Sequence, residues 1–204
     1  MKLYFTPGAC SLSPHITLRE AGLPFDLVKV DLKTHQLADG RDFYAINPKG
    51  AVPLLELDNG ERLSEGPVIV QYVADQVPNA GLAPAAGTVE RYRLQEWLNF
   101  ITTELHKGFS PLFNPATPED YKAIVKKKLG DRFGYVEDRL AGHDYLMGDS
   151  YSVADGYLYV MTRWAGAMGI DLAPHANLTA FAKRMAARPA VQAALAAEEA
   201  AKQA

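Results

Sequence analysis

The single cysteine of the chain is its strongest candidate for a reactive side chain. Cys10 lies in the segment Pro7-Gly8-Ala9-Cys10-Ser11, between a short strand-like opening and an amphipathic stretch. A thiol at a strand-to-helix turn lies beside unpaired backbone N–H groups and the positive end of a helix dipole. Those conditions favour the thiolate. The alternative is a small buried apolar side chain, the usual state of a cysteine. Position alone leaves both open.

Two further groups of residues could bind a polar ligand. Gly66 follows Glu65 where a helix is expected to begin, and a backbone N–H at a helix N-terminus binds anions. An acid there is equally explained by the helix dipole. Asn99, Thr103 and His106 are spaced i, i+4 and i+7, which places them on one face of an α-helix. His106 can hold or donate a proton near neutral pH, although the face could simply be solvated.

Composition limits the function classes. The chain has 204 residues, 48% of them hydrophobic, and a net charge of -3. That charge gives no reason to expect a nucleic acid or a membrane surface as partner. One cysteine cannot form an internal disulfide or a multi-cysteine metal site, so we expect no metal. The N-terminus lacks the pattern of a signal peptide, and we expect a cytoplasmic protein.

The elements that must position these residues differ between the two parts of the chain. In residues 1–79 apolar alternation and turn residues predict strands and helices in the order β-α-β-α-β-β-α. The expected strands are 3–5, 25–30, 52–57 and 61–63, and the expected helices are 13–22, a short turn near Phe43, and 66–77. The strand-helix-strand order predicts a parallel first pair, and Asp58-Asn59-Gly60 predicts a tight hairpin turn.

The second part predicts helices only. A Pro- and Gly-rich stretch ends at Gly87, and we assign residues 80–87 to a linker and 88–204 to an all-helical domain. Thr88 begins a helix to about Gly108, Pro118 begins another, and Ser152 with Asp155 forms a variant capping box. A further helix is expected over 177–187, and residues 200–204 are expected to fray.

The order and spacing of several motifs resemble a cytosolic glutathione S-transferase over essentially the whole chain. The resemblance rests on the segments 8–15 (GACSLSPH), 47–53 (NPKGAVP), 64–67 (SEGP), 98–100 (LNF), 104–107 (ELHK) and 151–155 (YSVAD). Cysteine in place of an N-terminal tyrosine or serine makes the chain similar to the bacterial beta class. The resemblance implies an α/β thioredoxin-like N-terminal domain followed by an all-α helical domain.

The resemblance assigns the first part of the chain to glutathione binding. Cys10 is expected beside the glutathione sulfur, where it can form a mixed disulfide, and Ser11 either donates to a sulfur anion or caps the helix. A cis bond between Val52 and Pro53 is expected to turn the valine backbone toward the cysteinyl part of glutathione. The resemblance implies that Glu65 and Gly66 bind the two charges of the γ-glutamyl group.

One residue departs from the family pattern. His35 stands where close beta-class relatives usually have a lysine that contacts the glycine carboxylate. A histidine there still donates a hydrogen bond but is mostly neutral at pH 7. We therefore expect weaker or more pH-dependent glutathione binding.

In the helical part the resemblance implies contacts to glutathione and to a second substrate. His106 is expected near the sulfur, and Asn99 with its neighbours is expected to reach glutathione in the other subunit of a homodimer. The remaining glutathione-binding residues are Thr103, Glu104 and Lys107, although Lys107 could equally be a surface residue. Aromatic side chains at Phe109, Phe113 and Trp164 are expected at the electrophile site, with the core as the alternative.

The implied function is a glutathione S-transferase that conjugates the glutathione thiolate, its co-substrate, to hydrophobic electrophiles. Thiol exchange or peroxidase activity is compatible with the same residues. The alternatives are a glutathione-dependent reductive dehalogenase or disulfide reductase, and a non-catalytic ligand-binding stress protein of the same fold. Cys10, Val52, Pro53, Glu65, Gly66 and His106 are all present, which favours an enzyme.

Overall fold

The computed structural model describes residues 1–203. It divides the chain into two compact units. The first unit combines Met1–Leu82 with the chain from Arg188 onward, and the second is Ala83–Ala187. The expected α/β part followed by a helical part is confirmed, and the break falls inside the expected linker 80–87.

The first unit contains a five-stranded sheet in the order β3-β2-β1-β4-β5. The strands are β1 (Lys2–Phe5), β2 (Asp26–Asp31), β3 (Gln36–Leu37), β4 (Leu54–Glu56) and β5 (Arg62–Ser64). As predicted, β1 and β2 are parallel, and β4 and β5 form an antiparallel hairpin. The two-residue strand β3, which pairs antiparallel with β2, was not predicted because so short a segment carries no alternation.

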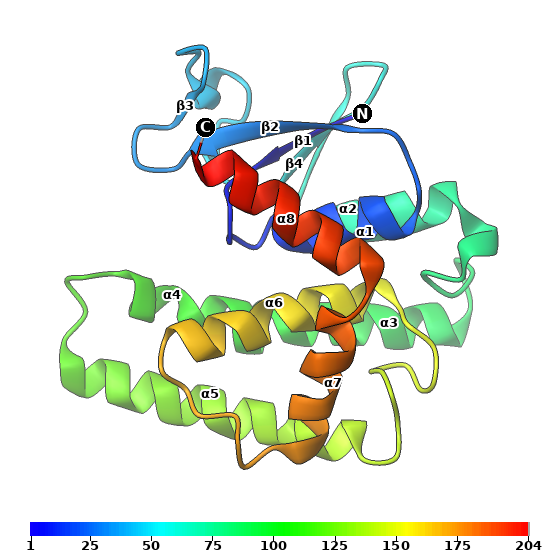
Figure 1. Cartoon of the computed structure of the whole chain (residues 1–204), viewed down its shortest axis with the longest axis vertical. Helices are drawn as coiled ribbons and strands as arrows, with labels where there is room; N and C mark the ends of the chain where they lie inside the picture. Colours follow the sequence, from blue (N-terminus) through cyan, green and yellow to red (C-terminus); the bar gives the residue numbers. More distant parts are fainter. Residues whose placement is uncertain (204) are drawn as a thin grey trace. The chain divides into compact units, whose positions relative to one another are not determined.

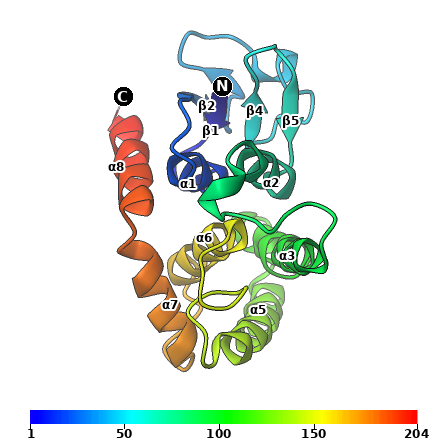
Figure 2. The same ribbon diagram turned by 90° about the vertical axis from the view of Figure 1, so that its right-hand side faces the viewer.

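Two helices of the first unit, α1 (Leu12–Glu20) and α2 (Gly66–Gln76), lie on the sheet. The unit also contains α8 (Pro189–Gln203) and 3₁₀ turns at Phe43–Ala45 and Pro78–Ala80. Figure 2 shows α1 and α2 on the same face of the sheet.

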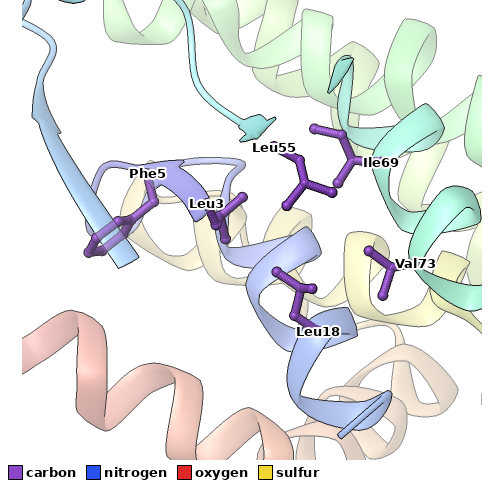
Figure 3. Close-up of a cluster of buried hydrophobic side chains, with 6 residues drawn as sticks. All are labelled: Leu3, Phe5, Leu18, Leu55, Ile69 and Val73. Atoms are coloured by element: carbon purple, nitrogen blue, oxygen red, sulfur yellow. The ribbon is translucent and has the colours of Figure 1, made fainter. Parts of the chain in front are cut away.

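The core of this unit lies between β1, β4 and the two helices α1 and α2. Leu3 and Phe5 point to this side of β1, because alternate residues of a strand face the same way. They meet side chains from the helices and from β4, as Figure 3 shows: Leu18, Leu55, Ile69 and Val73, all fully buried. Burying each such side chain contributes about 1.5–3 kcal/mol. This core fixes the end of β1 and the start of α1, and hence the turn that carries Cys10.

The terminal helix α8 belongs to the first unit, which differs from the expectation that 88–204 forms one helical domain. It packs along α1 (Figure 1). Arg188, just before α8, pairs with Glu20 at the end of α1 through two hydrogen bonds of 2.6 and 2.9 Å. The predicted fraying is not seen over residues 200–203, because α8 continues to Gln203 and the Ala201 carbonyl accepts from Lys29 Nζ at 2.6 Å. Ala204 lies outside the described residues.

The second unit is helical throughout its regular structure. Its helices are α3 (Val89–Phe100), a π-helical segment (Ile101–His106), α4 (Lys107–Phe113), α5 (Glu119–Leu140), α6 (Val153–Ala167) and α7 (Ala176–Ala186). The predicted caps are confirmed at Thr88, whose hydroxyl accepts from the Arg91 N–H, and at Ser152. The predicted helix 88–108 is instead three consecutive segments that reach Phe113.

A π-helical segment was not predicted because its sequence pattern is that of an ordinary helix. Its wider turn changes the angle between successive side chains, so α-helical spacing no longer holds across 101–106. Within residues 1–203, no helix has both the length and the apolar composition that crossing a bilayer requires.

Candidate functional site

The residues expected to bind or react fall into two groups, one in each unit. The first unit holds Cys10, Ser11, His35, Val52, Pro53, Glu65 and Gly66. The second unit holds Asn99, Thr103, Glu104, His106, Lys107, Phe109, Phe113 and Trp164.

Cys10 lies in the turn formed by residues 7–11, directly before α1, as predicted. It is half-buried, and its thiol donates to the Val52 carbonyl oxygen over 3.4 Å. The Leu12 N–H donates to the Ala9 carbonyl at 3.1 Å and holds the turn closed. Because the sulfur lies at the start of a nine-residue helix, the helix dipole favours its thiolate.

Ser11 closes this turn and does not cap α1. Its side chain makes no capping hydrogen bond. The buried hydroxyl accepts from the Thr6 N–H at 3.2 Å and donates to the Thr6 carbonyl at 3.3 Å. A hydroxyl carries one proton, so a proton directed at Thr6 is not directed at a sulfur. Of the two roles left open for Ser11, the helix cap is therefore wrong, and donation to a sulfur anion stays a prediction.

The bond between Val52 and Pro53 is cis, as the resemblance implied. Both residues are buried, and the Val52 carbonyl contacts the Cys10 thiol. A Cβ atom placed on Gly66 would lie 4.0 Å from Pro53 Cγ, so the start of α2 lies against the proline ring. Cys10, Val52, Pro53 and Gly66 therefore form one continuous cluster.

Glu65 precedes α2 in an unusual backbone conformation, with φ 71° and ψ 113°. A positive φ is uncommon for a residue other than glycine and often marks a functional site. Its exposed carboxylate lies 2.7 Å from Lys49 Nζ, which also donates to Ser64 Oγ at 3.2 Å. The acid expected at the start of the helix is present. Its carboxylate pairs with Lys49, a contact that was not predicted.

His35 also has a positive φ, 54°. Its ring stacks on Tyr44 with the centroids 4.4 Å apart. Gly50 makes this possible, because a Cβ atom there would lie 2.8 Å from Tyr44 Cζ and 3.0 Å from His35 Nδ1. His35 Nδ1 is buried and has no hydrogen-bond partner within residues 1–203. A buried lone pair costs less than a buried unpaired N–H, so the proton belongs on Nε2. Contact with the glycine carboxylate stays a prediction.

A buried carboxylate from the end of the chain holds the Cys10 turn. Glu198, only 3% exposed, accepts from the Gly8 N–H at 2.8 Å through Oε2. Its Oε1 lies 3.0 Å from His15 Nδ1, and His15 Nε2 accepts from Arg19 Nε at 2.9 Å. Because arginine only donates, the His15 proton is on Nδ1 and points at Glu198.

Glu198 was missed because the tail was read only as alanine-rich. A signal was present. Val191, Ala194 and Glu198 share the i, i+3, i+7 spacing of one helical face. An acid on an apolar face requires a buried partner.

His106 in the second unit is held by α6. Its Nδ1 is hydrogen-bonded to the Tyr157 hydroxyl. Its ring makes an edge contact with Trp164, with centroids 5.0 Å apart. Tyr157 was not predicted, since it lies in a run that is apolar nearly all round the helix. The π-helical segment ends at His106, and π-bulges occur frequently at functional sites.

The other polar residues of this segment do not share one helical face with His106 by α-helical spacing, because the π segment intervenes. Asn99 and Thr103 are exposed, and Thr103 Oγ1 donates to the Asn99 carbonyl at 3.1 Å. The Glu104 carboxylate accepts from Arg132 Nε at 2.8 Å. Lys107 is exposed. Their contacts to glutathione stay predictions.

The three aromatic residues expected at the electrophile site lie together. Trp164 contacts Phe109 and Phe113 edge-on, with centroids 5.6 and 4.9 Å apart. Phe109 is fully buried and also contacts Phe133, so it is part of the core. Phe113 is half exposed. Phe113 and the half-buried Trp164 are therefore the members of the set with exposed surface, and their binding role stays a prediction.

Comparisons with known proteins identify the family. Residues 8–76 match the glutathione S-transferase N-terminal domain, and residues 100–189 match the glutathione S-transferase C-terminal domain. Glutathione S-transferase GstA of Escherichia coli O157:H7 is 50% identical over 97% of this chain and 98% of its own length.

Two solved structures agree with this assignment. A sphingomonad glutathione S-transferase complexed with glutathione is 50% identical, covers 98% of this chain and 99% of its own, and superposes with a TM-score of 0.95. A bacterial beta class enzyme of Sphingomonas chungbukensis is 48% identical over 97% and 98% of the two chains, with a TM-score of 0.94. The chain therefore belongs to the glutathione S-transferase family, and within it to the bacterial beta class.

Proposed function

We propose that this protein binds glutathione and transfers its thiolate to hydrophobic electrophiles. The observation that carries the proposal is the cluster in which the Cys10 thiol contacts the carbonyl of Val52, beside cis-Pro53 and the start of α2. A solved relative at 50% identity holds glutathione. That likeness, together with the cluster in this chain, supports the same ligand here.

The binding step follows from backbone and charge. An extended peptide such as the cysteinyl part of glutathione can add to a backbone segment through N–H and C=O groups, as an added strand does. Val52 supplies that segment. The Gly66 N–H at the start of α2 suits the γ-glutamyl carboxylate, and the Glu65 carboxylate suits the neighbouring ammonium. His35 supplies a donor for the glycine carboxylate.

The chemical step requires a thiolate. The helix start next to Cys10 stabilises negative charge on sulfur, which applies to a glutathione sulfur bound beside it. His106 is the proposed proton-handling group, and Phe113 with Trp164 is the proposed apolar surface for the electrophile. Holding both substrates in position then supplies much of the rate.

Cys10 also favours a second activity, thiol–disulfide exchange. Its thiolate would attack one sulfur of a disulfide substrate, forming a new S–S bond as the old one breaks and the other sulfur leaves as a thiolate. A glutathione thiolate would then attack the mixed disulfide and release Cys10. A peroxidase activity would use the same thiols.

The substitution Cys10→Ala separates the two activities. We expect conjugation of glutathione to a generic aryl halide to remain within about tenfold, because the attacking sulfur belongs to glutathione. Disulfide reduction should be abolished. The measurements are both steady-state rates and retention on immobilised glutathione, with Cys10→Ser as the size-matched control. Loss of conjugation in both variants would make Cys10 part of sulfur activation. A wild-type protein that neither binds the matrix nor turns over the halide would contradict the proposed function.

Lys49 competes with the ligand for Glu65. Replacing Lys49 with Met keeps most of the unbranched side chain and removes an exposed ion pair, which is worth about 0.2–1 kcal/mol. The KM for glutathione should therefore fall by about threefold. Lys2→Met is the matched control, because Lys2 pairs with Glu56 elsewhere in the same unit. A rise in KM would show instead that Lys49 contacts the ligand's own carboxylate.

We also propose a cytoplasmic homodimer. Val89 and Tyr92 on α3 are largely exposed, and the rings of Trp97 and Phe100 on α3 form an aromatic group with Tyr135 on α5. Exposed apolar groups of this kind are typical of protein interfaces. Sedimentation should give the mass of two chains. A mass of one chain would refute the dimer.

A further inference from the structure

The ring of His35 lies in a slot formed by Tyr44 and Gly50, all within the first unit. His35 directly precedes β3, and its carbonyl accepts from the Phe43 N–H at 2.8 Å, which joins the two segments. The His35 and Tyr44 rings are inclined by 33°, with their centroids 4.4 Å apart. Gly50 closes the slot, because a Cβ atom there would lie 3.0 Å from His35 Nδ1 and 2.8 Å from Tyr44 Cζ. Both rings therefore use space that a side chain at position 50 would need.

Asn47 holds Gly50 in place. Asn47 is only 5% exposed, and its Nδ2 donates to the Ala51 carbonyl at 2.7 Å. Its own carbonyl accepts from the Gly50 N–H at 2.8 Å. The φ of Gly50 is 61°, a left-handed conformation that glycine adopts without strain. The loop is thus tied on both sides of Gly50, so the wall of the slot has a fixed position.

The slot determines which nitrogen of His35 can meet a ligand. Nδ1 is buried and has no hydrogen-bond partner within residues 1–203. A buried N–H without an acceptor is rarer in proteins than a buried acceptor without a donor, so Nδ1 of the neutral ring carries no proton. The proton is then on Nε2. Because the residue as a whole is only partly buried, His35 offers the Nε2–H as its donor.

We propose that Tyr44 and Gly50 are positioning residues for His35: the stacked ring and the missing side chain fix the orientation of the imidazole and its Nε2–H tautomer, so that it presents one neutral donor to a carboxylate. Donation to the glycine carboxylate of glutathione rests on the proposed function, whereas the orientation and the tautomer do not. When the slot is widened or filled, the ring can take other rotamers and exchange its two edges. The ligand must then order the ring, and that cost appears in the affinity.

Nitrogen-15 NMR of the protein without ligand tests the tautomer. At alkaline pH the wild-type His35 signals should show a protonated Nε2 and an unprotonated Nδ1. In Tyr44→Ala the signals should move toward a mixture of both tautomers, whereas Tyr44→Phe keeps the ring and should keep the wild-type signals. A protonated Nδ1 in the wild type, or unchanged signals in Tyr44→Ala, would overturn the proposal.

The substitution Gly50→Ala tests the slot from its other side. The added methyl group meets both rings, so the His35 signals should shift and the KM for glutathione should rise about fivefold. Gly22→Ala is the matched control: its φ of 64° imposes the same backbone strain, but its Cβ atom would meet no atom within 4 Å in the described chain. Equal effects of the two substitutions would assign the loss to strain and refute a positioning role for Gly50.

Kinetics test the consequence for binding. Tyr44→Ala should raise the KM for glutathione about fivefold with little change in kcat, because an oriented donor acts before the chemical step. Tyr44→Phe should keep the wild-type KM. In a His35→Ala background, Tyr44→Ala should have no further effect, and an equal rise in KM in both backgrounds would refute positioning through His35. Inactivity of the wild type would refute the proposed function, and the NMR signals would then decide whether the slot fixes the tautomer.

Discussion

Replacing Glu198 with Ala is expected to lower the free energy of unfolding by about 3 kcal/mol and to raise the KM for glutathione severalfold. The carboxylate is buried and accepts from the Gly8 N–H and from His15. Its removal leaves two donors without this acceptor, and each buried donor left unsatisfied costs about 1–3 kcal/mol.

The functional part of the prediction follows from the position of Gly8. It lies two residues before Cys10, in the same turn, so Glu198 fixes the backbone that presents the thiol to the Val52 carbonyl. Without the hydrogen bond between the Gly8 N–H and Glu198, the turn samples more conformations, and glutathione must order it on binding. That cost appears in KM more than in kcat, because it is paid before the chemical step.

Two controls make this prediction sharp. Glu199→Ala changes the neighbouring acid, which is exposed and pairs with Lys202, and should leave both quantities unchanged. Glu198→Gln keeps the volume but must direct its amide N–H₂ at one of the two donors, so it should lie between wild type and Glu198→Ala. Urea unfolding and glutathione saturation curves measure the two effects. Equal stability of Glu198→Ala and Glu199→Ala would show that the hydrogen bonds of Glu198 do not stabilise the fold.

Local patterns predicted the first unit well because its strands and helices follow short-range rules. Alternation in 52–57 and 61–63 around Asp58-Asn59-Gly60 gave the hairpin, which the structure contains as β4 and β5. The cis bond before Pro53 came only from the resemblance, because intrinsic energetics favour trans before proline. The cluster around Cys10 was likewise predictable only through the family.

What the sequence did not predict depends on contacts between distant residues. The packing of α8 on α1 joins positions more than 160 residues apart, as in the pair Arg188–Glu20. The ion pair of Lys49 with Glu65 and the hydrogen bond of Tyr157 with His106 arise in the same way. Helical periodicity indicates which face of α8 is buried, but it does not say which element covers it.

Replacing Asp155 with Ala is expected to have the largest effect on stability in the second unit, lowering the free energy of unfolding by about 3–5 kcal/mol. The side chain is fully buried. Its Oδ1 accepts from the Leu146 N–H at 2.8 Å, and its Oδ2 accepts from the Ser152 N–H at 2.8 Å and the Ser152 hydroxyl at 2.9 Å. A carboxylate at this position therefore accepts hydrogen bonds both from the residue that caps α6 and from the loop before it.

Single contacts can be separated by a series of variants. Ser152→Ala removes only the hydroxyl and should cost about 1 kcal/mol, the usual value of a helix N-cap. Asp155→Asn keeps the shape but replaces one acceptor oxygen with a donor N–H₂, which must face a backbone N–H, so its cost should approach that of Asp155→Ala. Asp149→Asn is the control, because this acid of the same loop is exposed.

The effect of Asp155→Ala should extend to the proposed catalytic residue. Tyr157 and Trp164, which both contact the His106 ring, are on α6, the helix whose first turn contains Asp155. Tyr157 is two residues from the lost hydrogen bonds, so disorder in the first turn of α6 should release the Nδ1 contact before it disturbs Trp164. Below the unfolding transition, the nitrogen-15 signals of the His106 ring in Asp155→Ala should therefore shift away from those of the wild type. If destabilised but folded Asp155→Ala keeps the wild-type His106 spectrum, the start of α6 is not what positions Tyr157.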